Sequence, residues 1–320
     1  MTPPDPLPWL LEPENPSARY LALTGLLDRP PDDPEVLATR AAIPGWGAAR
    51  AILDAQWPEG YWIAPGVGYS PKYKSTVWQV IILAALGAPR TAAIDRACDR
   101  VLSDSRLPDG RFSAKVTEQG AIVCLGGNLL RALMQLGFED PRMAESFEAL
   151  AGSALREGYR CRYNALQDES GAWPHHMRDG LPCAWGAIKA LGAFAEVPEA
   201  QRSSAVRDAI EAGVELLLGG NLAGGEYPTA TEPSSLWQQF GFPLAYTSDL
   251  LEALEVLGGL GIDLGVQLAP CLNEVRSKRD ASGRWALEHA LDNTWAEFGE
   301  IGQPNKWVTQ RAQHVLKRWA

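Results

Sequence analysis

The sequence lacks the long apolar runs and the N-terminal signal that mark membrane and secreted proteins. No window approaches the roughly 18–20 consecutive apolar residues of a membrane-spanning helix. The first residues, "MTPPDPLPWLLEPENP", have neither the basic start nor the apolar stretch of a secretory signal. We therefore expect a cytoplasmic protein with no integral membrane segment.

Basic clusters and a disulfide framework are also missing. The chain has 29 lysines and arginines against 39 aspartates and glutamates, a net charge of −10, which argues against a nucleic-acid partner. Five cysteines, an odd number in a chain of 320 residues, indicate reduced thiols. A Ser-His-Asp order, a phosphate-binding loop and a His-Glu-x-x-His helix are absent as well.

What the sequence does contain is a repeated pattern of glutamine, three residues, glycine, one residue and tryptophan. Full copies start at Gln56 and Gln167, and weaker copies start at Arg106, Asn221 and Arg279. The glutamine amide can bond free backbone groups at a helix end, the glycine permits a tight turn, and the ring packs against the next helix. Because chemistry usually occurs once and this pattern recurs, we interpret it as structural.

Between these copies, apolar helical segments such as "STVWQVIILAALG" alternate with amphipathic, more charged segments such as "TAAIDRACDRVLSD". Ser75 or Thr76, Ser248 and Asn305 are expected to cap helices. The chain has no low-complexity linker, and its N-terminal part reads as one more helix pair. We expect a single domain, 1–320, with repeats near 56–87, 106–137, 167–194, 221–258 and 279–319.

These repeated Gln-x-x-x-Gly-x-Trp elements between alternating helices resemble those of the terpenoid cyclases and protein prenyltransferases. The likeness covers nearly the whole chain and is greatest to short bacterial proteins labelled squalene-cyclase-like or prenyltransferase-like. The resemblance implies an all-α fold, an α/α toroid in which a double ring of about five to six helix pairs encloses a central cavity. It also implies an apolar, isoprenoid-like substrate.

The specific chemistries of those families are not carried over. No Asp-x-Asp-Asp element is present to protonate a substrate, and no Asp-Asp-x-x-Asp element is present to bind diphosphate through magnesium. The adjacent aspartates of "RPPDDPEV" lie in a proline-rich turn. Protein prenyltransferases hold zinc through an Asp-x-Cys pair, whereas here Leu181 stands two residues before Cys183.

Sulfur and imidazole groups form one candidate site. Cys124, Cys161, His175 and Cys183 are expected near the starts of two neighbouring inner helices and in the segment between them. Three thiols and an imidazole suit a tetrahedral zinc ion, which gives a possible zinc cofactor. The alternative is that the thiols pack in the core as small hydrophobic groups.

Candidate catalytic residues are Asp249, Tyr246, Lys306 and His175. A carboxylate at Asp249 among aromatic residues can act as a general acid or base, or it can simply favour the dipole of its own helix. Lys306 can recognise an anionic group, or its segment can seal the closure between the last and first repeats.

Candidate substrate-binding residues lie at the expected starts of inner helices or in aromatic loops, where they would wall an apolar cavity. They are Trp78, Gln79, Asn128, Trp185, Phe242, Trp295 and Trp307. The leading hypothesis is an enzyme with an aromatic-lined cavity that acts on an apolar, isoprenoid-like small molecule. One alternative is a zinc-assisted hydrolase or lyase, or one using an Asp249–Lys306 pair, and another is a non-catalytic scaffold that binds a lipid or peptide.

Overall fold

The computed structural model describes residues 3–160, 182–227, 233–245 and 247–320. Within these residues the regular elements are helices, and the paired extended residues form only isolated bridges. The predicted all-α class is confirmed. Among the same residues, no helix is both long and apolar enough to cross a membrane.

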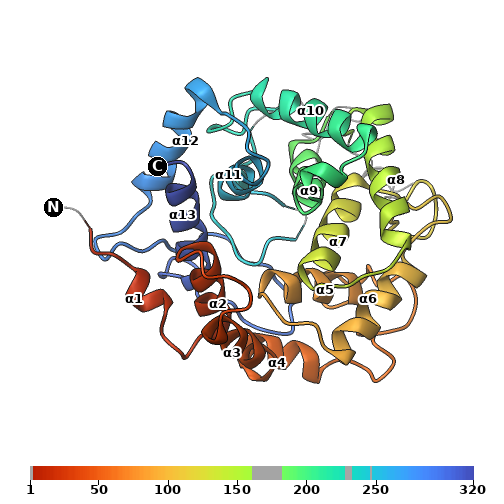
Figure 1. Ribbon diagram of the computed structural model, residues 1–320, viewed down its shortest axis with the longest axis horizontal. Helices are drawn as coiled ribbons and strands as arrows, with labels where there is room; N and C mark the ends of the chain where they lie inside the picture. Colours follow the sequence, from red (N-terminus) through yellow and green to blue (C-terminus); the bar gives the residue numbers. More distant parts are fainter. Residues whose placement is uncertain (1–2, 161–181, 228–232, 246) are drawn as a thin grey trace.

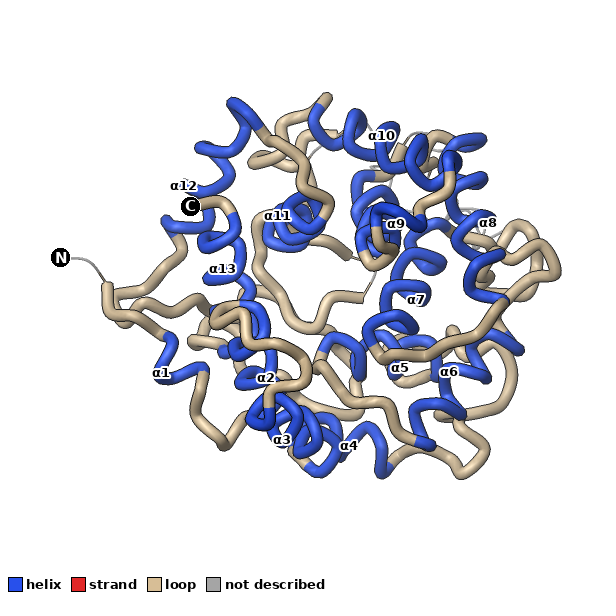
Figure 2. The backbone as a smooth tube through the Cα atoms, viewed as in Figure 1, coloured by secondary structure: helices blue, strands red, loops and turns tan. Residues whose placement is uncertain are grey.

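The helices form two concentric rings, and the chain alternates between them (Figure 1). The inner ring consists of α2 (Pro16–Gly25), α5 (Thr76–Ala85), α7 (Val123–Gln135), α9 (Ala184–Ala195), α11 (Leu250–Gly259) and α13 (Lys306–Arg318). The outer ring consists of α3 (Pro34–Ala42), α4 (Gly47–Asp54), α6 (Ala92–Asp104), α8 (Arg142–Glu157), α10 (Ser204–Leu218) and α12 (Leu268–Ser277). The short α1 (Leu7–Leu10) lies outside α2 (Figure 2). This is the α/α toroid that the resemblance implies.

A chain of hydrogen bonds joins the last inner helix to the first. The indole N–H of Trp307 in α13 donates to Oγ of Ser17 in α2 at 2.9 Å. The Ser17 hydroxyl in turn donates to the carbonyl of Leu86, just after α5, at 2.8 Å. The ring is therefore closed by contacts between residues about as far apart in the sequence as this chain allows.

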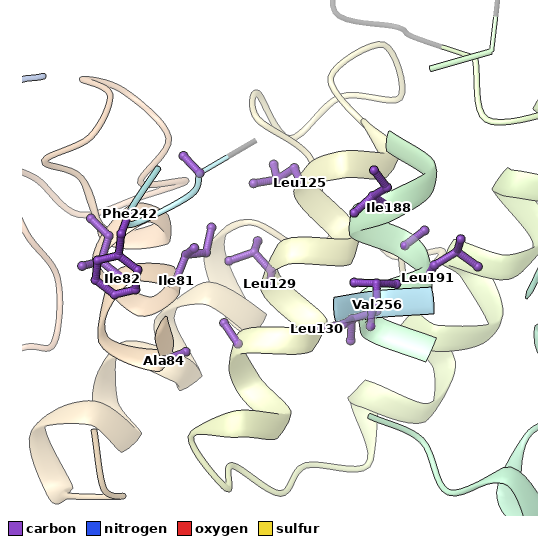
Figure 3. Close-up of a cluster of buried hydrophobic side chains, with 14 of the residues drawn as sticks. Ile81, Ile82, Ala84, Leu125, Leu129, Leu130, Ile188, Leu191, Phe242 and Val256 are labelled. Carbon is purple, nitrogen blue, oxygen red and sulfur yellow. The ribbon is translucent and has the colours of Figure 1, made fainter. Parts of the chain in front are cut away.

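The inner helices α5, α9 and α11 are apolar on nearly every side because neighbouring elements cover most of their faces. Residues 76–84 of α5 are all buried, and so are residues 186–194 of α9. Side chains of α5, α7, α9 and α11 meet in one cluster that includes Ile81, Leu129, Ile188 and Val256 (Figure 3). Each such side chain stabilises the fold by roughly 1.5–3 kcal/mol through burial.

The repeated sequence pattern makes the same contact in the copies at Trp62 and Trp285. The ring N–H of Trp62 donates to the carbonyl of Ile52 in the preceding outer helix at 2.7 Å, and Trp285 donates to Val275 at 2.7 Å. The backbone N–H of Trp62 also donates to Oγ1 of Thr76 in the next inner helix at 3.2 Å. The aromatic residue therefore ties an outer helix to the inner helix that follows.

The glycine of the pattern is required by backbone geometry. Gly60 has a φ of 93°, and a Cβ there would lie 2.7 Å from Cβ of Arg96. The Gln56 amide donates to the carbonyl of Ala93 at the start of the next outer helix at 3.0 Å. These contacts support the structural interpretation of the pattern, while the copy at 167–173 lies outside the described residues.

Candidate functional site

A cavity of about 520 Å³ lies inside the inner ring, and its wall contains both apolar and charged side chains. We call its apolar lining residues the apolar side; they are Leu21, Ile81, Ala84, Ala85, Phe242 and Leu244. We call its charged or titratable lining residues the charged side; they are Arg40, Arg131, Glu252, Glu255, Arg311 and His314. The cavity therefore combines a surface suited to hydrocarbon with one suited to a polar group.

The cavity lies towards the C-terminal ends of the inner helices, where Gly25 ends α2 and Gln135 ends α7. The sequence led us to expect ligand access at the opposite end. There the segment that precedes α11 crosses the interior of the ring (Figure 1). Its Phe242 stacks on Trp307 with ring centroids 4.7 Å apart, and its Ala245 carbonyl accepts a 2.8 Å hydrogen bond from Asn128.

A buried lysine anchors one part of the charged side. Lys189 of α9 is 1% exposed, and its amine donates to both carboxylate oxygens of Glu252 at 2.6 and 2.7 Å. Nη1 of Arg131 in α7 lies 3.4 Å from the same carboxylate. A buried ammonium without a partner is strongly unfavourable, so the fold needs the Glu252 carboxylate next to Lys189.

A second network joins α11 to α13. Arg311 donates two hydrogen bonds to Asp249, at 2.8 and 2.9 Å, and it also contacts both oxygens of Glu255. Burial opposes the charge of Arg311, but the carboxylates of Asp249 and Glu255 hold its pKa above the ordinary value. The guanidinium is thus a fixed part of the cavity wall.

Asp249 also accepts hydrogen bonds from the backbone N–H groups of Gly241 and Glu252, at 3.0 and 2.8 Å. It is the N-cap of α11, so the expected cap at Ser248 is wrong by one residue. Asp249 is 1% exposed, and both of its carboxylate oxygens accept hydrogen bonds from the protein. This is the geometry expected if the carboxylate serves only to stabilise the start of its own helix. Its catalytic role stays a prediction.

Lys306, the other expected acid–base group, faces the outside of the ring. Its amine lies 2.8 Å from a carboxylate oxygen of Glu12 and 5.4 Å from the centre of the Trp9 ring. The pairing of Lys306 with Asp249 is not formed, because each has a different ion partner. These contacts fasten the N-terminal segment to α13, as the ring-closure alternative requires.

The expected aromatic wall is mostly buried framework. Trp78 is 1% exposed and donates its ring N–H to the Tyr69 carbonyl at 2.7 Å. Trp295 donates to the Lys74 carbonyl at 2.9 Å, and Trp185 is half-buried in the first turn of α9. Gln79, which is fully buried, donates to the Tyr73 carbonyl at 2.7 Å. Of the seven expected binding residues, Asn128 and Phe242 line the cavity.

The predicted zinc ligands are only partly described. Cys124 lies in the first turn of α7, and Sγ of Cys183 caps α9 by accepting from the Gly186 N–H at 3.4 Å. Cys161, His175 and the catalytic candidate Tyr246 lie outside the described residues. In the part of the chain that is described, no three His, Cys, Asp or Glu side chains cluster in a way that could hold a metal ion.

Sequence reasoning missed the charged side of the cavity. Arg131, Lys189 and Glu252 each interrupt an apolar helix, in "NLLRALM", "GAIKALG" and "DLLEALE". A charge on a helix that is otherwise buried all round requires a partner on another inner helix. That rule applied to the inner helices would have pointed to these residues.

Comparisons with known proteins assign no family. No family model matches the chain, and no curated protein matches it. Among solved structures, the chain is similar to the type II terpene cyclase MstE from Scytonema in complex with its product, merosterolic acid A. That match has 12% identity, a TM-score of 0.32, and covers 88% of this chain and 96% of the other.

The same cyclase in complex with its substrate, geranylgeranyl dihydroxybenzoate, matches at 14% identity and a TM-score of 0.31, over 88% of this chain and 97% of the other. Its apo form matches at 14% identity and a TM-score of 0.29, over 88% and 98%. Similarity at this level identifies neither a family nor an activity for this chain.

Proposed function

We propose that the protein is an enzyme that acts on a small amphiphilic molecule with an isoprenoid-like hydrocarbon part and a polar head. The two-sided cavity is the observation that carries this proposal. Its volume of about 520 Å³ falls among those of pockets that hold small-molecule ligands. The protein would convert such a molecule in the manner of a cyclase or prenyltransferase.

The apolar side favours a hydrocarbon ligand. Leu21, Ile81, Ala84 and Phe242 come from α2, α5 and the segment before α11, and all four side chains are uncharged and apolar. Removing hydrocarbon from water contributes roughly 25 cal/mol for each Å² buried. A branched, flexible chain can follow such a surface without needing directional contacts.

The charged side requires that the ligand is not wholly apolar. A pure hydrocarbon filling the cavity would take Arg131 and Glu255 out of water without offering a hydrogen bond. A polar head placed against α7, α11 and α13 removes this penalty. The proposed substrate is therefore amphiphilic, which changes the expectation of a purely apolar molecule.

Phe242 supports the proposed type of chemistry. Its ring lines the cavity and stacks on Trp307 at an interplanar angle of 3°. Aromatic rings stabilise positive charge that develops next to them, and the cyclisation and prenyl transfer of isoprenoids pass through such charge. The substrate's hydrocarbon would lie beside this ring.

Farnesol serves as the probe that tests the proposal. We expect the wild type to bind farnesol by calorimetry and to form an isomer of unchanged mass, detected by gas chromatography with mass spectrometry. Ala85→Trp, which fills the cavity from the end of α5, should abolish both. Ala92→Trp makes the same change on the exposed start of α6 and should have no effect.

Two results would contradict the proposal. Binding by Ala85→Trp equal to that of the wild type would show that farnesol does not occupy the cavity. Binding to the wild type without any product, over a range of amphiphiles, would favour the non-catalytic scaffold instead.

A further inference from the structure

The cations around the cavity differ in how many of their donors are already used. Arg311 is occupied by Asp249, Glu255 and the Gly241 carbonyl. Lys189 is occupied by both oxygens of Glu252. These groups stabilise the ring and have little capacity left for a ligand.

Other cations are used at the C-terminal ends of inner helices, where free carbonyls carry partial negative charge. The donors and the carbonyls that they bond are Lys317 with Gly25, Arg40 with Gly87 and Gln135, Arg202 with Val197, and Arg318 with Gly258. The same device recurs around the ring, so these side chains have a structural explanation.

Arg131 has no comparable explanation. It lines the cavity and its side chain is 27% exposed, yet its two ion contacts are long, 3.4 Å to Glu252 and 3.5 Å to Glu196. Its Nε is buried without a hydrogen-bond partner among the described residues, and its Nη2 donates no hydrogen bond to them. A guanidinium normally uses its donors fully when it lies inside a protein.

The neighbouring carboxylates do not have the same spare capacity. Both oxygens of Glu252 accept from Lys189, and both oxygens of Glu255 accept from Arg311. Glu196 accepts a 2.8 Å hydrogen bond from the amide of Gln135. Other protein groups therefore already engage these carboxylates, whereas Arg131 has donors left that can bind an acceptor on the ligand.

We infer that Arg131 is the receptor for an anionic head group, a carboxylate or a phosphate, on the molecule that occupies the cavity. This inference rests on the proposed function and names the class of head group. Arg131 lies on α7 and lines the same cavity as the apolar residues of α2 and α5, so the head would meet the guanidinium while the hydrocarbon lies along α2 and α5. Planar guanidinium groups suit carboxylate and phosphate because two parallel hydrogen bonds can form.

Farnesoic acid, farnesyl monophosphate and farnesol share one hydrocarbon chain and differ in the head, so their affinities test the inference directly. We expect wild-type protein to bind the acid or the phosphate more tightly than the alcohol. Arg131→Gln should weaken binding of the preferred anion by about 10- to 100-fold, the value of a charge-assisted hydrogen bond, and leave farnesol nearly unchanged. Whichever anion shows this dependence is the head group.

The matched control is Arg50→Gln, which removes an arginine 67% exposed on the outer ring and should change none of the affinities. If Arg131→Gln fails to fold, Arg131→Lys keeps the charge without the planar fork and should still lose part of the preference. The wild-type comparison of acid and alcohol needs no variant.

The outcomes separate the inference from the proposed function. If the wild type binds all three probes equally and Arg131→Gln changes none of the affinities, the inference that Arg131 binds an anionic head group is overturned, while the proposed function stands. Failure of all three to bind would overturn the proposed function.

Discussion

The two ends of the inner ring are built from opposite chemistry. At the end where the inner helices begin, aromatic side chains are packed together, and the ring N–H groups of Trp78 and Trp307 already have partners. At the end where the helices finish, charged side chains surround a cavity, and Arg131 has donors to spare. The comparison teaches that abundant tryptophan marks the framework here, whereas charged side chains that line a cavity mark the candidate site.

The difference follows from what each kind of group needs. A tryptophan stabilises the fold by burying a large apolar surface, and a single backbone carbonyl satisfies its one polar atom. A guanidinium has several donors in one plane, so it needs several acceptors before all of its donors are used. The bonded tryptophans are therefore complete without a ligand, and Arg131 is not.

The largest effect is expected at the aromatic end. Trp307→Ala removes a ring that stacks on Phe242 and leaves the Ser17 hydroxyl without its indole donor, so the free energy of unfolding should fall by about 3–5 kcal/mol. Urea denaturation measures this. Trp57→Ala, at a ring 53% exposed, is the control and should change stability by about 0.5 kcal/mol or less. Unchanged stability with lost farnesol binding would place Trp307 in the site after all.

A somewhat smaller loss is expected in the charged network between α9 and α11. Glu252→Leu leaves the Lys189 amine buried without a partner, which should lower the free energy of unfolding by about 3 kcal/mol. The loss should not be larger, because the unpaired amine can become neutral by losing its proton. The double variant Lys189→Met, Glu252→Leu should recover most of that loss. If the double variant is as unstable as Glu252→Leu alone, the unpaired amine of Lys189 is not the cause of the lost stability.

The smallest effect concerns His289, next to the segment that crosses the ring. Burial lowers its pKa below the ordinary 6.5, although Asp249 and Asp292 oppose this. The unfolded chain then binds the proton more tightly, so stability should fall as the pH drops below about 6.5. His289→Gln should make this fall shallower in urea denaturation. An unchanged slope would show that His289 does not contribute to it.

Much of the framework could be read from local patterns. The spacing of apolar residues predicted the alternation of inner and outer helices, and the glycine before Trp62 predicted a tight turn that its φ of 93° requires. The site was harder to predict. The sequence predicted that residues at the starts of the inner helices wall the cavity, but the stacked rings of Phe242 and Trp307 are packed at that end of the ring.

By itself the sequence determined which segments are helices, which of them are buried all round, and where the turns between them lie, because periodicity and backbone freedom act over a few residues. Only the tertiary structure decided which end of the ring holds the cavity and which charges meet there. Glu252 is separated from Lys189 by 63 residues and from Arg131 by 121, so they come together only when α7, α9 and α11 pack side by side.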